Sequence, residues 1–334
     1  MRSNRAPTLK SPKIKVGITI GDPSGIGPAV TAKAVNALSG KAGFVVIGDK
    51  WVFDRAQSSC LPAGRAMLKA QNLEFIDLKN VDRKSFSFGK IRAEYGRASI
   101  EYLDKAMELL KKRRIDCLVT APISKEAINL AGYHYSGHTE YLKEKDKAKD
   151  IVMLLLNEKM RFALATRHIP LSRVSSEITQ EKLRKTVSIA YNSLKKLFAI
   201  KNPRIVICGL NPHASDNGLI GKEENKVVKP AIKRLRKAIK DLEGPITADV
   251  AIYRLMSGCY DCAIAMYHDQ ALIPLKLSGF DKGVNVTLGL SFIRTSPLHG
   301  TAFDIARKSK LADPASLIAA IKLAIQCTRN LKKA

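Results

Sequence analysis

The sequence lacks the features that mark membrane and secreted proteins. No apolar stretch in its 334 residues approaches the roughly 20 residues that a membrane-spanning helix needs. Residues 1–15 are polar and basic, are typical of a short disordered lead-in, and contain no apolar core of a signal peptide. We therefore expect a cytoplasmic protein without membrane contact.

Cysteines are few and scattered. Four of the six lie in or next to apolar runs: Cys117, Cys208, Cys262 and Cys327. This pattern is typical of reduced, buried thiols and argues against a disulfide framework. Cys259 and Cys262 form a C-x-x-C pair, but no second pair accompanies it, and Cys262 begins a predicted buried strand. We therefore expect neither a redox nor a zinc role for this pair.

Acidic residues are also scarce, with 30 Asp and Glu against 57 Lys and Arg, a formal net charge of +27. Such a charge indicates either long-range attraction to anionic ligands or nucleic acid, or a solvated, lysine-rich surface. The basic residues are dispersed along amphipathic stretches, only 6% of residues are aromatic, and no nucleic-acid motif is present. These observations favour the second interpretation, without specific nucleic-acid binding.

Apolar runs alternate with helical patterns, which predicts an α/β fold with mostly parallel sheets. The expected strands are 14–20, 44–47, 115–120, 151–156, 160–166, 204–210, 262–267 and 284–288. One expected helix begins at Gly27, and another is capped by Ser124 and closes near Gly132. The others span 100–112, 181–198, 226–242, 248–256 and 314–330. We expect two α/β/α domains with an active-site cleft between them, formed by 1–135 with 275–334 and by 136–274.

Three of the six histidines follow predicted strands: His168, His213 and His268. In open α/β sheets, ligands bind at the carboxyl ends of the strands. Each histidine on its own is compatible with a structural hydrogen-bonding role. Together they indicate a shared divalent metal such as Zn²⁺, which acts as a Lewis acid on an alcohol or carbonyl and stabilises an enolate.

Two loops are candidate anion sites. Gly21–Pro28 follows the first strand and opens a helix, so it is either a phosphate or nucleotide loop or a purely structural turn. It does not match G-x-G-x-x-G. The second loop is Gly137–Glu140. Thr139 is a candidate N-cap, with Glu140 in the first turn of the helix. Alternatively, His138 beside it donates to an anionic ligand.

Downstream lie Lys276, Asn285 and Arg294. Lys and Arg near one cleft clamp a phosphate or carboxylate, although Lys276 alone also fits a surface charge. Arg294 lies between apolar and small hydroxyl residues, which is atypical of the surface. The segment His299–Ala306 is either a loop close to a cofactor or a helix start capped by Thr301.

Several of these motifs, in this order, resemble the 4-hydroxythreonine-4-phosphate dehydrogenases of pyridoxal phosphate (vitamin B6) biosynthesis. The resemblance covers essentially the whole chain after the basic lead-in. It rests on Gly21–Pro28, Thr120–Ile123, Gly137–Glu140, Gly209–Ala214, Ala265–Gln270, Gly283–Leu290 and Phe292–Ser296. The wider group looks like the isocitrate and isopropylmalate dehydrogenases.

The resemblance implies a metal- and NAD(P)-dependent oxidation followed by decarboxylation. It implies that His168, His213 and His268 bind the metal, which is Zn²⁺, Mg²⁺ or Co²⁺. It implies substrate contacts from a further set of residues: His138, Thr139, Lys276, Asn285 and Arg294. It also implies that His299 and Gly300 border the NAD or NADP, and that two subunits share their active sites in a homodimer. Lys276, Asp249 and a water are alternative proton acceptors.

The chain departs from the family pattern in three places. Ala29 stands where glutamate is usual, Arg167 precedes His168 where a small or hydroxyl residue is common, and 307–309 replace a glycine-containing turn. The last departure concerns the shape of the cofactor loop. A related dehydrogenase of threonate or erythronate 4-phosphate is the alternative function, since the same metal and phosphate clamp would serve it.

Overall fold

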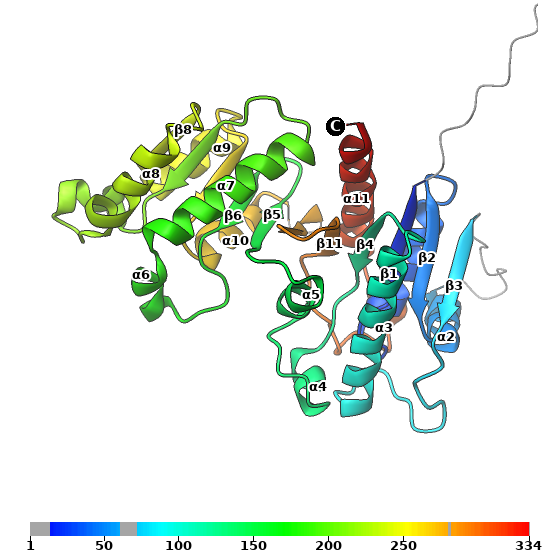
Figure 1. Cartoon of the computed structure of the whole chain (residues 1–334). Coiled ribbons are helices and arrows are strands. Elements are labelled where there is room, and N and C mark those ends of the chain that lie inside the picture. The colour runs from blue at the N-terminus through cyan, green and yellow to red at the C-terminus, as the bar shows by residue number, and fades with distance from the viewer. Residues whose placement is uncertain (1–13, 61–71, 280–281, 334) are drawn as a thin grey trace, which may run out of the picture.

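The computed structural model describes residues 14–60, 72–279 and 282–333 (Figure 1). Residues 1–13 of the expected basic lead-in lie outside the described residues, whereas Lys15 already belongs to the first strand. Within them, no helix combines the length and apolarity that crossing a bilayer requires.

The strands form one continuous, mostly parallel sheet of eleven strands, which confirms the α/β class. In spatial order they are β3 (Leu73–Asp77), β2 (Gly43–Gly48), β1 (Lys15–Thr19), β4 (Cys117–Thr120), β11 (Arg294–Pro297), β10 (Val284–Leu288), β5 (Val152–Leu156), β6 (Arg161–Leu164), β9 (Cys262–Ala265), β7 (Ile205–Cys208) and β8 (Leu242–Ile246). Only the central pairs β11–β10, β10–β5 and β5–β6 are antiparallel. The sheet therefore joins two parallel halves through an antiparallel centre.

The helices lie on both sides of this sheet (Figure 1). They are α1 (Gly27–Ala37), α2 (Lys50–Cys60), α3 (Ala93–Lys111), α4 (Lys125–Leu130), α5 (His138–Asp146), α6 (Val174–Glu177), α7 (Gln180–Lys196), α8 (Lys229–Leu235), α9 (Ala248–Met256), α10 (His268–Leu277) and α11 (Ala315–Lys333). Short helical turns span Leu171–Arg173, Pro212–Gly218, Glu224–Val228 and Ser309–Leu311.

The side chains of a strand alternate between the two faces of the sheet, and this explains why helices cover both faces. In β7, Ile205 and Ile207 join the larger core, which includes α7 and α8, whereas Val206 and Cys208 join a smaller core with α9 and α10. Successive side chains of a strand point to opposite faces, so a strand that is apolar throughout needs cover on both. The second half of the molecule is therefore an α/β/α sandwich.

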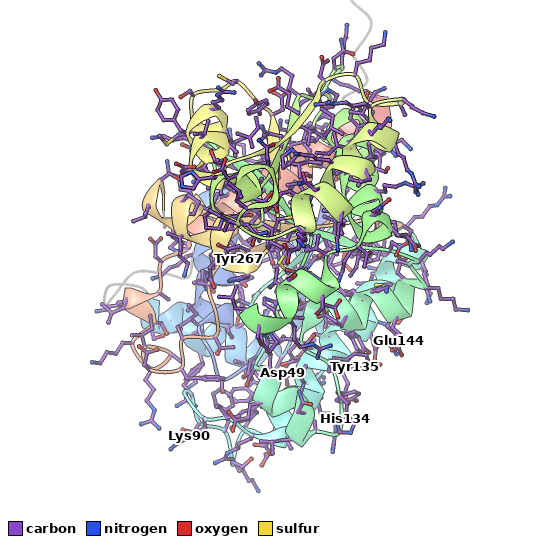
Figure 2. The ribbon with its side chains drawn as sticks, turned by 90° about the vertical axis from the view of Figure 1, so that its left-hand side faces the viewer. Asp49, Lys90, His134, Tyr135, Glu144 and Tyr267 are labelled. Atoms are coloured by element: carbon purple, nitrogen blue, oxygen red, sulfur yellow. The ribbon has the colours of Figure 1, made fainter. Side chains whose placement is uncertain are left out.

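The half with β1 to β4 and α11 lies apart from the half with β6 to β9 (Figure 1). From another side, Asp49 and Lys90 of the first half lie below Tyr267, which precedes α10 in the second (Figure 2). The two expected domains, 1–135 with 275–334 and 136–274, remain a prediction. Strand β10 (Val284–Leu288) follows α10 and pairs with both β5 and β11.

Most strands and helices match their predicted positions, but the helix expected over 226–242 is wrong. Helix α8 ends at Leu235, and β8 starts at Leu242, which pairs with Ile205 of β7. The apolar positions Leu235, Ile239 and Leu242 continue a helical spacing, so the pattern alone did not reveal the turn between them.

Sequence reasoning also did not predict α2, β3, β11 or α10 as separate elements. Strand β3 is only partly buried, so it lacks a continuous apolar run. Strand β11 is the polar sequence Arg-Thr-Ser-Pro, although it is buried throughout. Helix α10 contains Pro274, a residue that normally ends helices.

Candidate functional site

A cavity of about 340 Å³, here the Arg294 cavity, lies where the end of β4, the start of α5, β10 and β11 meet. It is lined by Thr120, Pro122, Ile123, Lys125, Ser136, Gly137, His138, Thr139, Glu140, Met153, His168, Asn285, Arg294, Ser296, Pro297, His299 and Gly300. The fold thus brings most of the candidate site residues to one place, including both predicted substrate and predicted cofactor residues.

Arg294 is the most unusual group in this cavity because its guanidinium is buried and forms no ion pair with another described residue. The residue is 2% exposed. Its Nη2 and Nε donate to Thr120 Oγ1 at 2.7 and 3.2 Å, and Nη1 donates to Thr287 Oγ1 at 3.0 Å. Within the described residues no carboxylate lies within ion-pair distance of it. Burial lowers the pKa of Arg294 to about 10, so the group is still cationic at neutral pH.

A buried charge is costly unless an opposite charge and hydrogen bonds compensate it. Two hydroxyl groups satisfy only part of the five N–H donors of an arginine. The geometry of Arg294 therefore fits an anionic ligand, and phosphate or carboxylate matches its planar fork.

The start of α5 adds further donors. Gly137 is the N-cap with φ 148°, so the helix begins at His138, and Thr139 lies inside it. The reading of Thr139 as the N-cap is therefore wrong, whereas Glu140 does lie in the first turn. Backbone N–H groups without intrahelical partners point out of a helix start and favour anions. The residues at this helix start, Gly137 to Glu140, line the same cavity as Arg294.

His138 is held neutral. Burial and the nearby charge of Arg294 lower the pKa of His138 well below its usual range. Its Nε2 is buried and has no hydrogen-bond partner within the described residues. A neutral imidazole donates or accepts at this nitrogen according to its tautomer, so His138 fits a ligand atom there.

Two further buried polar atoms of this cavity lack partners in the described part of the chain: Asn285 Oδ1 and His299 Nε2. Most buried polar atoms of folded proteins are hydrogen-bonded, so an orphan that faces a cavity suggests a ligand or water. Gly300 leaves open space, since a Cβ placed there would meet no atom within 4 Å. Sequence reasoning selected all three residues.

His168 and His268 lie side by side, with ring centroids 5.4 Å apart. They follow the adjacent parallel strands β6 and β9. Thr166 fixes this arrangement, because its N and Oγ1 both donate to Met266 O, at 3.2 and 2.6 Å. Asp269 Oδ1 lies 3.0 Å from His268 Nδ1. A carboxylate at Nδ1 orients an imidazole so that Nε2 is available to a metal.

His213 follows β7, the strand next to β9, yet it does not join the other two histidines. Within the described residues no group of three or more His, Cys, Asp or Glu side chains is close enough to hold a metal. The loop of His213 is held elsewhere by the buried Glu224, which accepts from Leu210 N at 2.9 Å and Asn211 N at 2.8 Å. One chain therefore brings together two of the three predicted ligands.

The charge of His213 instead acts on Asp249 at the start of α9. Hydrogen bonds from Val250 N and Thr247, more than His213, lower the pKa of Asp249. The exposed Lys276 lies near the end of α10 and does not line the Arg294 cavity. The structure thus leaves both candidate proton acceptors outside this cavity.

The two glycine-containing loops meet each other. Ile26 N donates to Thr301 O at 2.9 Å, and a Cβ on Gly25 would lie 2.9 Å from the same oxygen. Residues 301–308 form turns and no helix, so the reading of Thr301 as a helix cap is wrong. Because Gly21–Pro28 packs against this loop, its glycines serve at least a structural role.

Lys125 and Ser136 line the Arg294 cavity but were not predicted. Lys125 is the first residue of α4, and its charge contributes, after burial, to the lowered pKa of His168. The sequence position of Lys125 could have marked it as a site residue, because it closely follows the end of β4, where ligands of α/β sheets bind. Ser136 had no comparable signal.

Comparison with known proteins identifies relatives along nearly the whole chain. The family model described as "Pyridoxal phosphate biosynthetic protein PdxA" matches residues 40–324. The 4-hydroxythreonine-4-phosphate dehydrogenase of Sulfurihydrogenibium sp. (strain YO3AOP1) is 43% identical over 327 residues, which cover 96% of this chain and 100% of the relative. The D-threonate 4-phosphate dehydrogenase of Salmonella typhimurium is 39% identical, covering 93% of this chain and 98% of the relative.

A solved structure agrees with these matches. The crystal structure of 4-hydroxythreonine-4-phosphate dehydrogenase from Klebsiella pneumoniae has a TM-score of 0.85 and 35% identity, covering 96% of this chain and 99% of that chain. All three relatives are dehydrogenases, and the chain is an α/β oxidoreductase. More narrowly, it belongs to the pyridoxal phosphate biosynthetic protein PdxA family.

Proposed function

We propose that the chain oxidises 4-phosphooxy-L-threonine at its C3 hydroxyl with NAD or NADP, and that the product loses CO₂ to give 3-amino-2-oxopropyl phosphate. The buried guanidinium of Arg294, which has no ion pair with any described residue, is the observation that carries this proposal. It lies in one cavity with the start of α5 and with Asn285. Relatives named for this reaction and for D-threonate 4-phosphate both act on a phosphorylated substrate.

The phosphate would bind between Arg294 and the start of α5, where neutral His138 and Thr139 supply hydrogen bonds. This arrangement would position C3 without adding a repulsive charge. Orientation of this kind lowers a reaction barrier because the entropy of alignment is lost on binding and not in the transition state. Lys276 and Asn285 are proposed as further substrate contacts.

A divalent ion, when bound, supplies a Lewis acid for the hydroxyl and the later enolate, and a nicotinamide supplies the hydride acceptor. His168 and His268 fit the ion, because their rings are adjacent and Asp269 orients one of them. Burial, more than the charges of Lys125 and His268, lowers the pKa of His168 and favours the neutral, ligating form. His299 and Gly300 would border the cofactor.

We further propose that a second copy of the chain supplies His213. The apolar side chains exposed on α9 and α10 support a homodimer: Tyr253 is 67% exposed and Leu277 85%, and Met256 and Ile273 are also exposed. Exposed apolar patches on helices mark association surfaces. A two-fold dimer would carry His213 and Asp249 from one subunit to the partner. Asp249, kept ionised by its lowered pKa, would then be available to accept the hydroxyl proton.

The second candidate function is oxidation of a four-carbon sugar-acid 4-phosphate such as threonate or erythronate 4-phosphate. The Salmonella typhimurium relative named for D-threonate 4-phosphate favours it. The same phosphate clamp and metal would serve, with a hydroxyl in place of the amino group. The two candidates therefore differ at C2 of the substrate.

The test is to follow NAD(P)H absorbance with 4-phosphooxy-threonine and with threonate 4-phosphate, after chelation and with added Zn²⁺, Mg²⁺ or Co²⁺. We expect metal-dependent turnover that is faster with the first substrate. Faster turnover of threonate 4-phosphate selects the second function, and turnover of neither contradicts both. Retained activity after chelation contradicts the metal assignment. Fractionation would check the expected cytoplasmic location.

A further inference from the structure

A second cavity, here the Lys143 cavity, lies between α5, α7 and the segment after β6 and has a volume of about 320 Å³. Four cationic side chains line it, Lys143, Arg167, Lys182 and Lys185, against two carboxylates, Glu140 and Asp150. We infer that this cavity is a second anion site that binds a small oxyanion, either inorganic phosphate or the phosphate group of a small metabolite.

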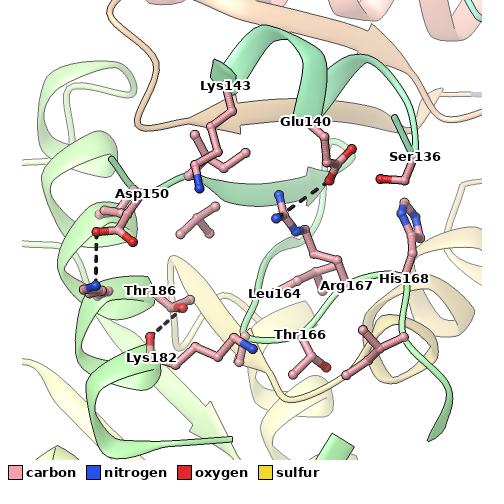
Figure 3. A pocket seen from close by; sticks show the side chains of 16 residues that line it. Ser136, Glu140, Lys143, Asp150, Leu164, Thr166, Arg167, His168, Lys182 and Thr186 are labelled. Atoms are coloured by element: carbon pink, nitrogen blue, oxygen red, sulfur yellow. Dashed lines mark hydrogen bonds and ion pairs between the residues drawn. The ribbon is translucent and has the colours of Figure 1, made fainter. Parts of the chain in front are cut away.

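The cations approach the cavity from three elements. Figure 3 shows Lys143 of α5, Arg167 after β6 and Lys182 of α7 directed into the same space. Cationic donors that converge in a concave, partly desolvated site attract an anion more strongly than the same groups dispersed on a surface. The convergence of the three side chains, more than their number, therefore distinguishes this cavity from the generally basic surface.

Two of these cations, Arg167 and Lys143, have N–H donors available for a ligand. Arg167 Nη1 is buried and has no hydrogen-bond partner in the described part of the chain. Its Nη2 lies 3.7 Å from Glu140 Oε1, which is an ion pair but longer than a normal hydrogen bond. The half-buried Lys143 makes no ion pair within residues 14–60, 72–279 and 282–333.

The other two cations are already paired. Lys182 Nζ lies 2.8 Å from Glu177, and Lys185 Nζ lies 2.9 Å from Glu181 and 3.4 Å from Asp150. These carboxylates largely compensate the charges of Lys182 and Lys185, so Arg167 and Lys143 supply the donors for an anion. Arginine binds a phosphate through its planar fork and lysine as a point charge, so this pair suits a tetrahedral oxyanion.

The Lys143 cavity is distinct from the Arg294 cavity although the two adjoin. They share Ser136, Glu140 and His168, but Arg294 lines only one of them and Lys143 only the other. Glu140 and its ion pair with Arg167 lie at the boundary (Figure 3). An anion bound to Arg167 would therefore lie close to the predicted metal ligand His168 without occupying the proposed substrate position.

The experiment is a calorimetric titration of the full-length protein with inorganic phosphate, in a chloride buffer of low ionic strength. The wild type is expected to bind two phosphate ions per chain, one in each cavity. Arg167→Gln and Lys143→Gln should each weaken one of the two sites by about tenfold or more, because a charge-assisted hydrogen bond is lost. A parallel titration with glycerol phosphate distinguishes the free ion from a phosphate monoester.

Lys145→Gln is the matched control, since Lys145 is also on α5 and loses the same charge but pairs with Asp104 outside the cavity. It should keep both sites. Unchanged binding in both cavity variants, or equal weakening in the control, overturns the inference, as does a wild type that binds a single phosphate. Lys143→Gln serves as the second variant if Arg167→Gln does not fold.

The inference is separable from the proposed function. Lys143→Gln should form NADH at the wild-type rate while it loses one phosphate site. A protein that binds two phosphates but turns over neither substrate contradicts the proposed function and leaves the second site supported.

Discussion

The candidate site has a phosphate end, the Arg294 cavity, and a metal end, the predicted ligands His168, His213 and His268. The two ends are assembled differently. A single chain assembles the Arg294 cavity from β4, α5, β10 and β11, and among its described residues none forms an ion pair with the buried guanidinium there. At the strand ends β6 and β9 it brings His168 and His268 together, but it holds His213 apart. Under the proposed function, one subunit would supply the phosphate site in the Arg294 cavity, whereas metal binding would require two.

The sharpest way to test the phosphate end is Arg294→Met, which keeps most of the side-chain volume and removes the charge. We expect kcat/KM to fall about 1000-fold, since a buried charged partner of the substrate is lost. The melting temperature should not fall, because the variant also removes the cost of burying an uncompensated cation. Kinetics and thermal unfolding would be measured together, with the exposed Arg113→Gln as control.

The metal end can be tested by mixing two inactive variants. We expect His168→Ala and His213→Ala each to lose activity about 100-fold or more. Random reassociation of the two variants should restore about a quarter of wild-type activity, because half of the dimers are mixed and each contains one intact site. If all three histidines act within one chain, mixing restores nothing, and the contrast between the two ends disappears.

Protonation of the buried Asp22 makes the stability of the half that contains the Arg294 cavity depend on pH. Burial, opposed by hydrogen bonds from Ser24 N and Oγ, raises the pKa of Asp22 from 3.8 to about 6. A raised carboxyl pKa contributes stability that is complete below pH 3.8 and is lost as the pH rises through about 6.

Asp22→Asn should remove this pH dependence. Its free energy of unfolding relative to wild type should therefore rise by up to about 3 kcal/mol between pH 4 and pH 8. Denaturant titrations at both pH values would measure this, with the half-buried Asp54→Asn as control. A difference between variant and wild type that does not change with pH would contradict the buried-carboxyl assignment.

The smallest expected change in the free energy of unfolding comes from removing one helix N-cap in each half. Ser124 Oγ accepts from Ala127 N at 3.1 Å at the start of α4, and Thr179 Oγ1 accepts from Lys182 N at 3.1 Å at the start of α7. Ser124→Ala and Thr179→Ala should each lower the free energy of unfolding by about 1 kcal/mol. Equal shifts of one cooperative transition indicate that the halves unfold together, whereas two separate transitions indicate two domains.

Sequence reasoning succeeded where a residue's local pattern decides its role. Strand ends followed by histidine predicted β6, β9 and β7 with His168, His268 and His213. The expected strands 151–156 and 160–166 leave three residues between them, and Asn157 closes the turn there, since its Oδ1 accepts from Lys159 N and Met160 N at 2.9 Å each. Local hydrogen bonds and apolar runs are visible in sequence because the interacting residues are neighbours.

It failed where a distant partner determines the structure. Strand β11 has a polar sequence, and only its place between β4 and β10 makes it part of the sheet. Likewise Leu242 continues a helical spacing, but pairing with Ile205 makes it a strand. Such pairings join residues far apart in the chain, so the periodicity of neighbouring residues does not predict them.

The sequence by itself determined the α/β class, most of the candidate site residues and the family. Tertiary structure alone decided that Arg294 is buried with only hydroxyl partners, that Gly21–Pro28 packs against Thr301, and that His213 stays apart from its two fellow histidines. The physical reason is that residue type and local spacing determine what a side chain can do, whereas burial and the distance between strands determine which groups act together.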